Sequence, residues 1–196
     1  NEVISKGDKA FAGCHGLKNL SLPSKLKYVG SFEFCKNIKS ISLPDSTKDT
    51  ADGMFTGCEM LTSVKLPRKL KAIKAYDFAD CRKLTKLNIP VTVKVVYMSA
   101  FAGSGLKKIV LPSNVQKIRN GNDGQKVFEY IKGIGYPTKN LRVIEIHSKK
   151  VKSIQKNSFS GLSSKVVIKV PKSKKKKYTK MLRKSGLSKK VKICNL

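Results

Sequence analysis

The sequence has few cysteines, no tryptophan and no long hydrophobic run. Five cysteines among 196 residues is an odd number and too few for a disulfide scaffold, which excludes a small disulfide-stabilised fold. No segment approaches the roughly 18 consecutive apolar residues that a membrane-spanning helix needs. The first ten residues, Asn1–Ala10, are polar and show no pattern of a secretory signal. We therefore expect a chain without a transmembrane segment.

Acidic residues are also scarce, with 12 Asp and Glu against 42 Lys and Arg and a net charge of +30. The last acidic residue is Glu145, and 17 basic residues follow it between His147 and Leu196. Hydrophobic residues make up 40% of the chain, enough for one packed domain despite the charge. The charge itself favours an anionic partner.

An internal repeat of about 23 residues dominates the sequence, and such a period is typical of solenoids. Phenylalanines recur at intervals of 21, 23, 23 and 23 residues, and a cysteine follows each of the first four after three residues. The phenylalanines are Phe11, Phe32, Phe55, Phe78 and Phe101. The cysteines are Cys14, Cys35, Cys58 and Cys81, and Ser104 takes the fifth place. We expect both rows to lie in the core.

Each unit also carries a short pattern of apolar residues that ends in proline, for example Leu17-Leu20-Leu22-Pro23. Apolar residues two positions apart indicate a strand with one buried face, and the proline ends it. A single unit cannot bury its own apolar face, whereas stacked units share a continuous core. The pattern therefore predicts a β-rich repeat solenoid with short turns and helices.

The Ala-Phe-x-Gly-Cys segment at Ala10–Cys14 and the repeated Leu-x-x-Leu-x-Leu-Pro strands resemble the BspA-type leucine-rich repeat. The resemblance implies a right-handed leucine-rich repeat solenoid of about seven units. It also implies a non-catalytic interaction module on the surface of bacteria or secreted by them. We assign residues 1–171 to the array, with an interruption at 119–140, and residues 172–196 to a basic C-terminal cap. Val3 and Ile4 resemble the end of an earlier unit, so we expect a longer parent array.

The cap is expected to be a helix over Lys172–Lys184 with Ser173 as its N-cap, followed by a strand around Val191–Ile193. Its lysines have three interpretations: a solvated helix face, an anion-binding patch for sulfated glycans, teichoic acids or membranes, or a nuclear-localisation or nucleic-acid signal. The candidate anion patch comprises Lys172, Lys174, Lys175, Lys176, Lys177, Lys180, Arg183 and Lys184.

No motif in the sequence indicates catalysis, a metal or another cofactor. Equivalent cysteines of a solenoid lie about 4.8 Å apart in a row and cannot converge on one zinc ion. His15 and His147 belong to different units without a partner cluster, and the acidic residues are scattered. Cys194 lies outside the row and is expected to be a free thiol. We expect no enzyme and no cofactor.

The outward strand positions form the expected ligand-binding face, because that face stays free when the other side of each strand is buried. Its candidate residues are Lys18, Lys39, Lys65, Asn88, Lys107, Arg142 and Glu145. The interruption adds two candidate anchors, Tyr130 and Tyr136, which are either exposed or cover the break in the stack. No aromatics align on the face, so nucleic acid is not the expected partner.

These observations favour a monomeric cell-surface or secreted adhesion module that binds an extracellular protein or glycan through the strand face and the inserted loop. The alternative is a polyanion-binding module that acts through the lysine-rich cap. A solvated face with ordinary solubilising lysines accounts equally well for the charge.

Overall fold

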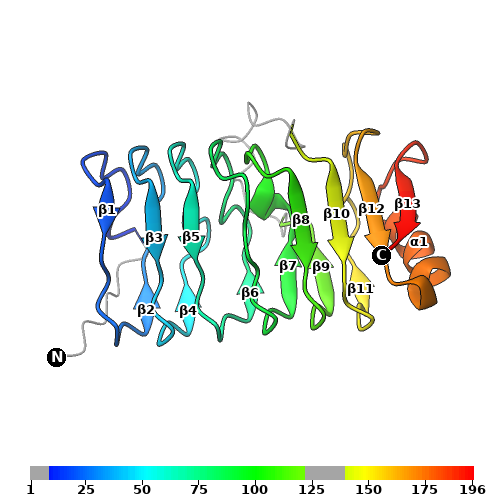
Figure 1. Ribbon diagram of the computed structural model, residues 1–196, viewed down its shortest axis with the longest axis horizontal. Coiled ribbons are helices and arrows are strands. Elements are labelled where there is room, and N and C mark those ends of the chain that lie inside the picture. The colour runs from blue at the N-terminus through cyan, green and yellow to red at the C-terminus, as the bar shows by residue number, and fades with distance from the viewer. Residues whose placement is uncertain (1–8, 122–139) are drawn as a thin grey trace.

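The computed structural model describes residues 9–121 and 140–196. Its strands are short and parallel, and they follow one another along the long axis of the molecule (Figure 1). Each unit hydrogen-bonds to the next through its backbone, as predicted for a repeat solenoid. The predicted fold class is confirmed.

The first row of strands forms what we call the strand face, with β1, β3 and β5 in one sheet and β8, β10, β12 and β13 in another. Between the two sheets, the unit around Leu87 contributes no assigned strand. The register places equivalent apolar residues side by side, as in Ile109, Ile144 and Ile168. The strands are β1 (Asn19–Leu20), β3 (Ser40–Ser42), β5 (Ser63–Lys65), β8 (Lys108–Leu111), β10 (Val143–Ile146), β12 (Val167–Val170) and β13 (Lys192–Asn195).

A second row of strands runs beside the first, in the lower part of Figure 1. Here β2 pairs with β4, and β6, β7, β9 and β11 form a parallel four-stranded sheet. A short 3-10 helix, η1 (Met98–Phe101), follows β7. The strands are β2 (Tyr28–Val29), β4 (Asp49–Thr50), β6 (Ala72–Ile73), β7 (Val95–Tyr97), β9 (Lys117–Arg119) and β11 (Ser153–Ile154).

The phenylalanine row is a continuous ring stack in the core, as predicted. Neighbouring rings are nearly parallel, with centroids 5.0 Å apart for Phe11–Phe32 and 6.4 Å apart for Phe78–Phe101. Such aromatic pairs add about 0.5–1.5 kcal/mol each to the free energy gained by burial. Phe32, Phe55, Phe78 and Phe101 are buried, whereas Phe11 at the first described unit is half-buried.

Three of the four repeat cysteines lie in the core beside this stack, as predicted, but Cys14 is exposed. Each buried thiol donates a hydrogen bond to the phenylalanine carbonyl of the preceding unit, at 3.1 Å from Cys58 Sγ to Phe32 O. Cys14 belongs to the first described unit, so no equivalent carbonyl from an earlier described unit covers it. Burial raises the pKa of the Cys58 thiol to about 12, which keeps it neutral.

The C-terminal end is covered by a 3-10 turn η3 (Lys172–Lys174), the helix α1 (Lys175–Lys184) and β13. Tyr178 is fully buried, and its hydroxyl accepts from Val151 N at 3.0 Å and donates to Ser148 O at 2.9 Å. The predicted start of the helix was wrong. Lys174 is the N-cap, without a side-chain capping bond, because residues 172–174 form the 3-10 turn in which Ser173 lies.

In the described part of the chain, the longest helix has ten residues, and none is long and apolar enough to cross a membrane.

Candidate functional site

The strand face carries the predicted binding residues on its solvent side. Along β3, for example, Ile41 is buried whereas Ser40 and Ser42 are exposed, because successive side chains of a strand point to opposite faces. Lys65 on β5 and Asn88 in the following unit are exposed in the same way. The face is therefore polar and partly basic along both sheets, as the repeat pattern predicted.

The stripe at the start of these strands is held in line by backbone bonds between units. Lys39 N donates to Lys18 O at 3.1 Å, Thr62 N donates to Lys39 O at 2.9 Å, and Arg142 N donates to Lys107 O at 2.9 Å. The four basic side chains of the stripe, Lys18, Lys39, Lys107 and Arg142, are all exposed. The structure therefore brings them together in one row on one face.

Glu145 occupies the same face but is only 9% exposed. Its carboxylate lies 3.0 Å from His147 Nε2, 2.9 Å from Lys108 Nζ on β8 and 3.6 Å from Lys169 Nζ on β12. The hydrogen bond with His147, followed by the hydrogen bond and charge of Lys108 and the charge of Lys169, holds the pKa of this carboxyl below its ordinary value. Glu145 thus contacts three neighbouring side chains through its carboxylate, which leaves its oxygens little capacity for a ligand.

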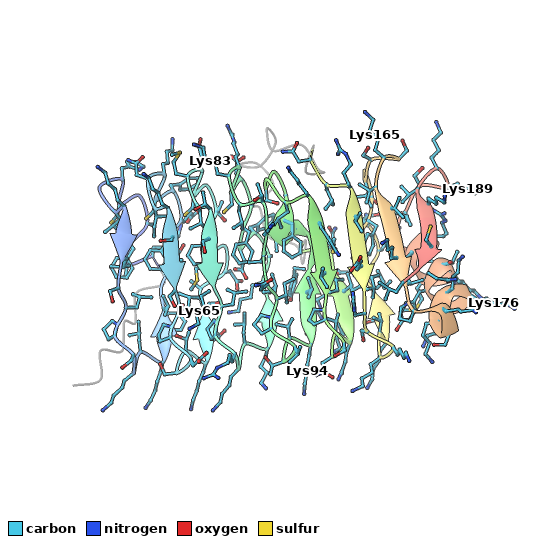
Figure 2. All side chains as sticks on the ribbon, in the orientation of Figure 1. Lys65, Lys83, Lys94, Lys165, Lys176 and Lys189 are labelled. Carbon is cyan, nitrogen blue, oxygen red and sulfur yellow. The ribbon has the colours of Figure 1, made fainter. Side chains whose placement is uncertain are left out.

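The cap patch divides into exposed lysines and side chains with structural contacts. Arg183 is half-buried and donates to Ser188 O and, at 2.9 Å, to Val191 O, so it ties α1 to the segment before β13. Lys174 is half-buried at the N-cap. The remaining members of the patch are exposed, namely Lys172, Lys175, Lys176, Lys177, Lys180 and Lys184. Figure 2 shows Lys176 at the far end of the molecule.

The two loop anchors, Tyr130 and Tyr136, lie outside the described residues, as does most of the interruption assigned to 119–140.

A basic row that the sequence analysis did not single out lies along the turns between the two rows of strands. The residue immediately before each strand of the second row is an exposed lysine in five of six units, and it is Gln116 before β9. We call this row the lysine column; it comprises Lys27, Lys48, Lys71, Lys94 and Lys152. The signal was present in the repeat itself, but the lysines escaped notice because lysine is abundant throughout the chain.

A buried carboxyl was also missed. Asp77 is 5% exposed, and its carboxylate accepts hydrogen bonds from Lys74 N at 2.7 Å and Met54 N at 3.5 Å. Burial raises its pKa from 3.8 to about 8. The nearby Lys74 ammonium pairs with Asp49 at 3.0 Å and Asp52 at 3.4 Å. These contacts join two adjacent units and give Asp77 a structural role.

Within the ranges 9–121 and 140–196, no group of three or more His, Cys, Asp or Glu side chains is arranged to hold a metal ion. The described titratable groups with shifted pKa values are explained by burial or by ion pairs that hold the units together.

Comparison with known families gives a clear match. The family described as "BspA type Leucine rich repeat region" matches in six copies, over residues 4–134 and 129–195. A comparison with curated proteins gives no significant match.

Solved structures with the same fold are bacterial leucine-rich repeat proteins. A leucine-rich repeat protein from Bacteroides ovatus is 24% identical, with a TM-score of 0.57 over 95% of this chain and 52% of that one. The leucine-rich repeat protein of T. pallidum is 21% identical, with a TM-score of 0.61 over 85% of each chain. The pneumococcal vaccine antigen PcpA is 21% identical, with a TM-score of 0.56 over 87% of this chain and 44% of that one. The chain thus spans about half the length of the Bacteroides protein and less of PcpA.

Proposed function

Because this chain belongs to the BspA-type leucine-rich repeat family, we propose that it is a non-catalytic interaction module that binds a protein or a glycan through its strand face. The proposal includes an array over residues 1–171, a cap over 172–196, and a location at the cell surface or outside the cell. It also includes a monomeric state.

The observation that carries this proposal is the row of exposed polar and basic side chains on a rigid ladder. Lys39 and Lys107 are held by backbone bonds to neighbouring units, so their positions are set by the array. A ligand that contacts several units at once pays little entropy for ordering such a surface, because the backbone is already in place. Exposed side chains with few ion pairs among described residues remain available for contacts.

The direct test is binding to a panel of extracellular-matrix proteins, heparin, anionic liposomes and duplex DNA at two salt concentrations. We expect one matrix protein or glycan to remain bound at high salt, since a shaped site depends less on screened charge. A strand-face variant combines Lys39→Ser, Lys65→Ser, Lys107→Ser and Arg142→Ser, and it is expected to weaken that binding roughly tenfold or more.

The matched control removes the same charge elsewhere, with Lys25→Ser, Lys83→Ser, Lys156→Ser and Lys189→Ser. All four of these lysines are exposed. An equal loss in both variants would contradict binding through the strand face. Loss of every ligand at high salt would contradict a shaped site altogether.

The second candidate function is polyanion binding through the cap. In α1 the first turn has no acidic residue and begins with Lys175, Lys176 and Lys177. Cations near the N-terminus of a helix oppose its dipole, so helix stability does not account for these lysines. An open depression lined by His147, Lys149, Pro171, Lys172, Ser173 and Leu196 lies beside them.

A cap variant with Lys175→Gln, Lys176→Gln, Lys177→Gln and Lys180→Gln tests this function. We expect weaker binding to heparin and liposomes and an unchanged or higher melting temperature, since unfavourable charges leave the helix N-terminus. Unchanged polyanion binding would contradict this second function and leave the first one standing.

A further inference from the structure

The lysine column differs from the strand face and the cap in both position and geometry. Backbone bonds align its units, from Lys48 N to Lys27 O at 2.8 Å and from Lys94 N to Lys71 O at 2.8 Å. The next position in the row is Gln116, whose backbone N donates to Lys94 O at 2.8 Å. The row ends at Lys152, whose backbone N donates to Gln116 O at 2.7 Å. Thr47 N and Leu70 N close the same turn in their units, which places Lys48 and Lys71 at equivalent positions.

The column follows the long axis of the molecule along one edge. Figure 2 shows Lys94 at the lower edge, whereas Lys83 and Lys165 lie at the upper edge and Lys65 lies on the strand face. Parallel strands lie about 4.8 Å apart, so the five steps from Lys27 to Lys152 span about 24 Å. The fold therefore presents a row of cations at the interval of the repeat, interrupted once at Gln116.

Four of the five lysines of this row are not neutralised within the part of the chain that the structure describes. The two acidic residues nearest to Lys48 in the sequence are engaged elsewhere, since Asp45 pairs with Arg68 at 2.6 Å and Asp49 pairs with Lys74 at 3.0 Å. Among the described residues, Lys48, Lys71, Lys94 and Lys152 have no ion-pair partner. Like charges about 4.8 Å apart repel each other by about 0.9 kcal/mol in water, less where the side chains spread. Among the residues that the structure describes, no ion pair of these four lysines offsets that repulsion.

We propose that the lysine column binds an extended sulfated polysaccharide that lies along the axis of the solenoid. A straight row of ammonium groups matches a linear polymer with anionic groups along its length. The phosphate strands of duplex DNA wind around their axis and meet a straight row only where they cross it. Binders of single-stranded nucleic acid add aromatic platforms on which the bases stack, and the column positions hold only lysine and glutamine. Lysine, a compact point charge, also suits diffuse attraction better than bidentate recognition.

The test uses heparin oligosaccharides of defined length and the full chain. The column variant combines Lys48→Gln, Lys71→Gln, Lys94→Gln and Lys152→Gln. The control variant, Lys83→Gln, Lys156→Gln, Lys165→Gln and Lys189→Gln, removes the same charge from exposed lysines outside the column and the strand face. The Kd is measured by titration calorimetry over a range of salt concentrations, and circular dichroism with thermal melting confirms that each variant is folded.

We expect the Kd of the column variant to rise roughly 10- to 30-fold, as four weak surface ion pairs are lost. The control should change less than about threefold, and the salt slope of the column variant should fall by about 3, at roughly 0.7 per contact. Affinity should rise with oligosaccharide length up to the span of the column and then level off. An equal loss in both variants, or no dependence on length, would overturn the proposal.

Two further arms separate this proposal from the others. The cap variant should retain most of the heparin affinity, and a greater loss than in the column variant would overturn the column as the site. A single-stranded oligo-dT should bind more weakly than heparin oligosaccharides of similar charge. Tighter binding of oligo-dT through the column would overturn the assignment to a sulfated polysaccharide. Neither result bears on binding of a protein through the strand face.

Discussion

The two halves of the solenoid are held together by different contacts. In residues 9–80, the strands have two or three residues. The units there are joined by stacked phenylalanine rings and by hydrogen bonds from buried thiols, such as Cys58 Sγ to Phe32 O at 3.1 Å. In the second half, β8, β10, β12 and β13 have four residues each, and neighbouring strands pair over three or four residues. Units of the same length can therefore be joined mainly by stacked phenylalanine rings or mainly by paired strands.

The halves also differ in charge. Residues 9–80 hold 12 basic and 7 acidic residues, whereas residues 81–121 and 140–196 hold 26 basic residues and one acidic residue, Glu145. The first half offsets part of its charge with ion pairs such as Arg68–Asp45 and Lys74–Asp49. The second half has one acidic side chain shared by three partners. The difference indicates that the backbone ladder tolerates a large excess of charge, provided that the lysines point into solvent.

The largest difference between the halves is expected in how the free energy of unfolding changes with pH. Asp77 in the first half has a pKa of about 8 in the folded chain, above its ordinary 3.8, so the folded state binds its proton more tightly. Its contribution to stability is therefore full below pH ~4 and is lost as the pH rises to ~8, by at most about 1.4 kcal/mol per pH unit. Urea unfolding from pH 4 to 8 should show a fall for the wild type that Asp77→Asn removes.

Glu145 should act with the opposite sign in a different window. Its folded pKa lies below the ordinary value of 4.5, so its contribution is present at neutral pH and is lost as the pH falls through the acid range. Glu145→Gln should leave the pH 4–8 trend intact and reduce the loss of stability in acid. For Asp77, a free energy of unfolding that changes with pH in the same way in the wild type and in Asp77→Asn would contradict the role assigned to this buried carboxyl.

The next largest effect is expected from the ring stack. Phe55 lies between Phe32 and Phe78, with ring centroids 5.8 Å and 5.7 Å away, and is 1% exposed. Phe55→Ala should lower the free energy of unfolding by about 3–5 kcal/mol, because it removes the ring and leaves a cavity. Val91→Ala serves as the control, since Val91 is exposed.

Hydrogen exchange identifies the units in which Phe55→Ala lowers stability. In repeat proteins stability is a sum of unit and nearest-neighbour terms, so Phe55→Ala should speed exchange at the amide of Ile41 in β3 more than at Ile144 in β10. Equal acceleration in both strands would indicate that the two halves unfold as one unit and would contradict independent contacts within each half.

The smallest effect concerns the thiols and is expected to be a difference in reactivity. Cys35, Cys58 and Cys81 are fully buried, and burial raises the pKa of each thiol. A thiol-specific reagent should therefore label Cys14 and Cys194 in the native protein and the three buried thiols only after unfolding. Mass spectrometry of the labelled peptides identifies the sites. Rapid labelling of Cys58 in the native state would contradict the packed thiol row.

Much of the fold was predictable because the repeat records it several times. The apolar positions, the phenylalanine row and the buried cysteines all follow from one period, and a local error in one unit is corrected by the others. The predictions were wrong at two places where neighbouring copies of the repeat give no information. These are Cys14 in the first described unit and the start of the cap helix, which is not part of the repeat. Glu145 is buried because it lies between β8 and β12, and the residues next to it in the sequence do not indicate this.

The repeat pattern is sufficient to predict the solenoid, its core residues and the buried face of each strand, because a period of two within a period of about 23 admits few alternatives. Which charges meet depends instead on how the units stack. Lys108 and Lys169 lie far from Glu145 in the chain yet share its carboxylate, and the lysines between Lys27 and Lys152 become one row only when the units stack. The physical reason is that stacking brings residues one repeat apart to within about 4.8 Å of each other. At that distance charge, burial and hydrogen bonding are decided between units.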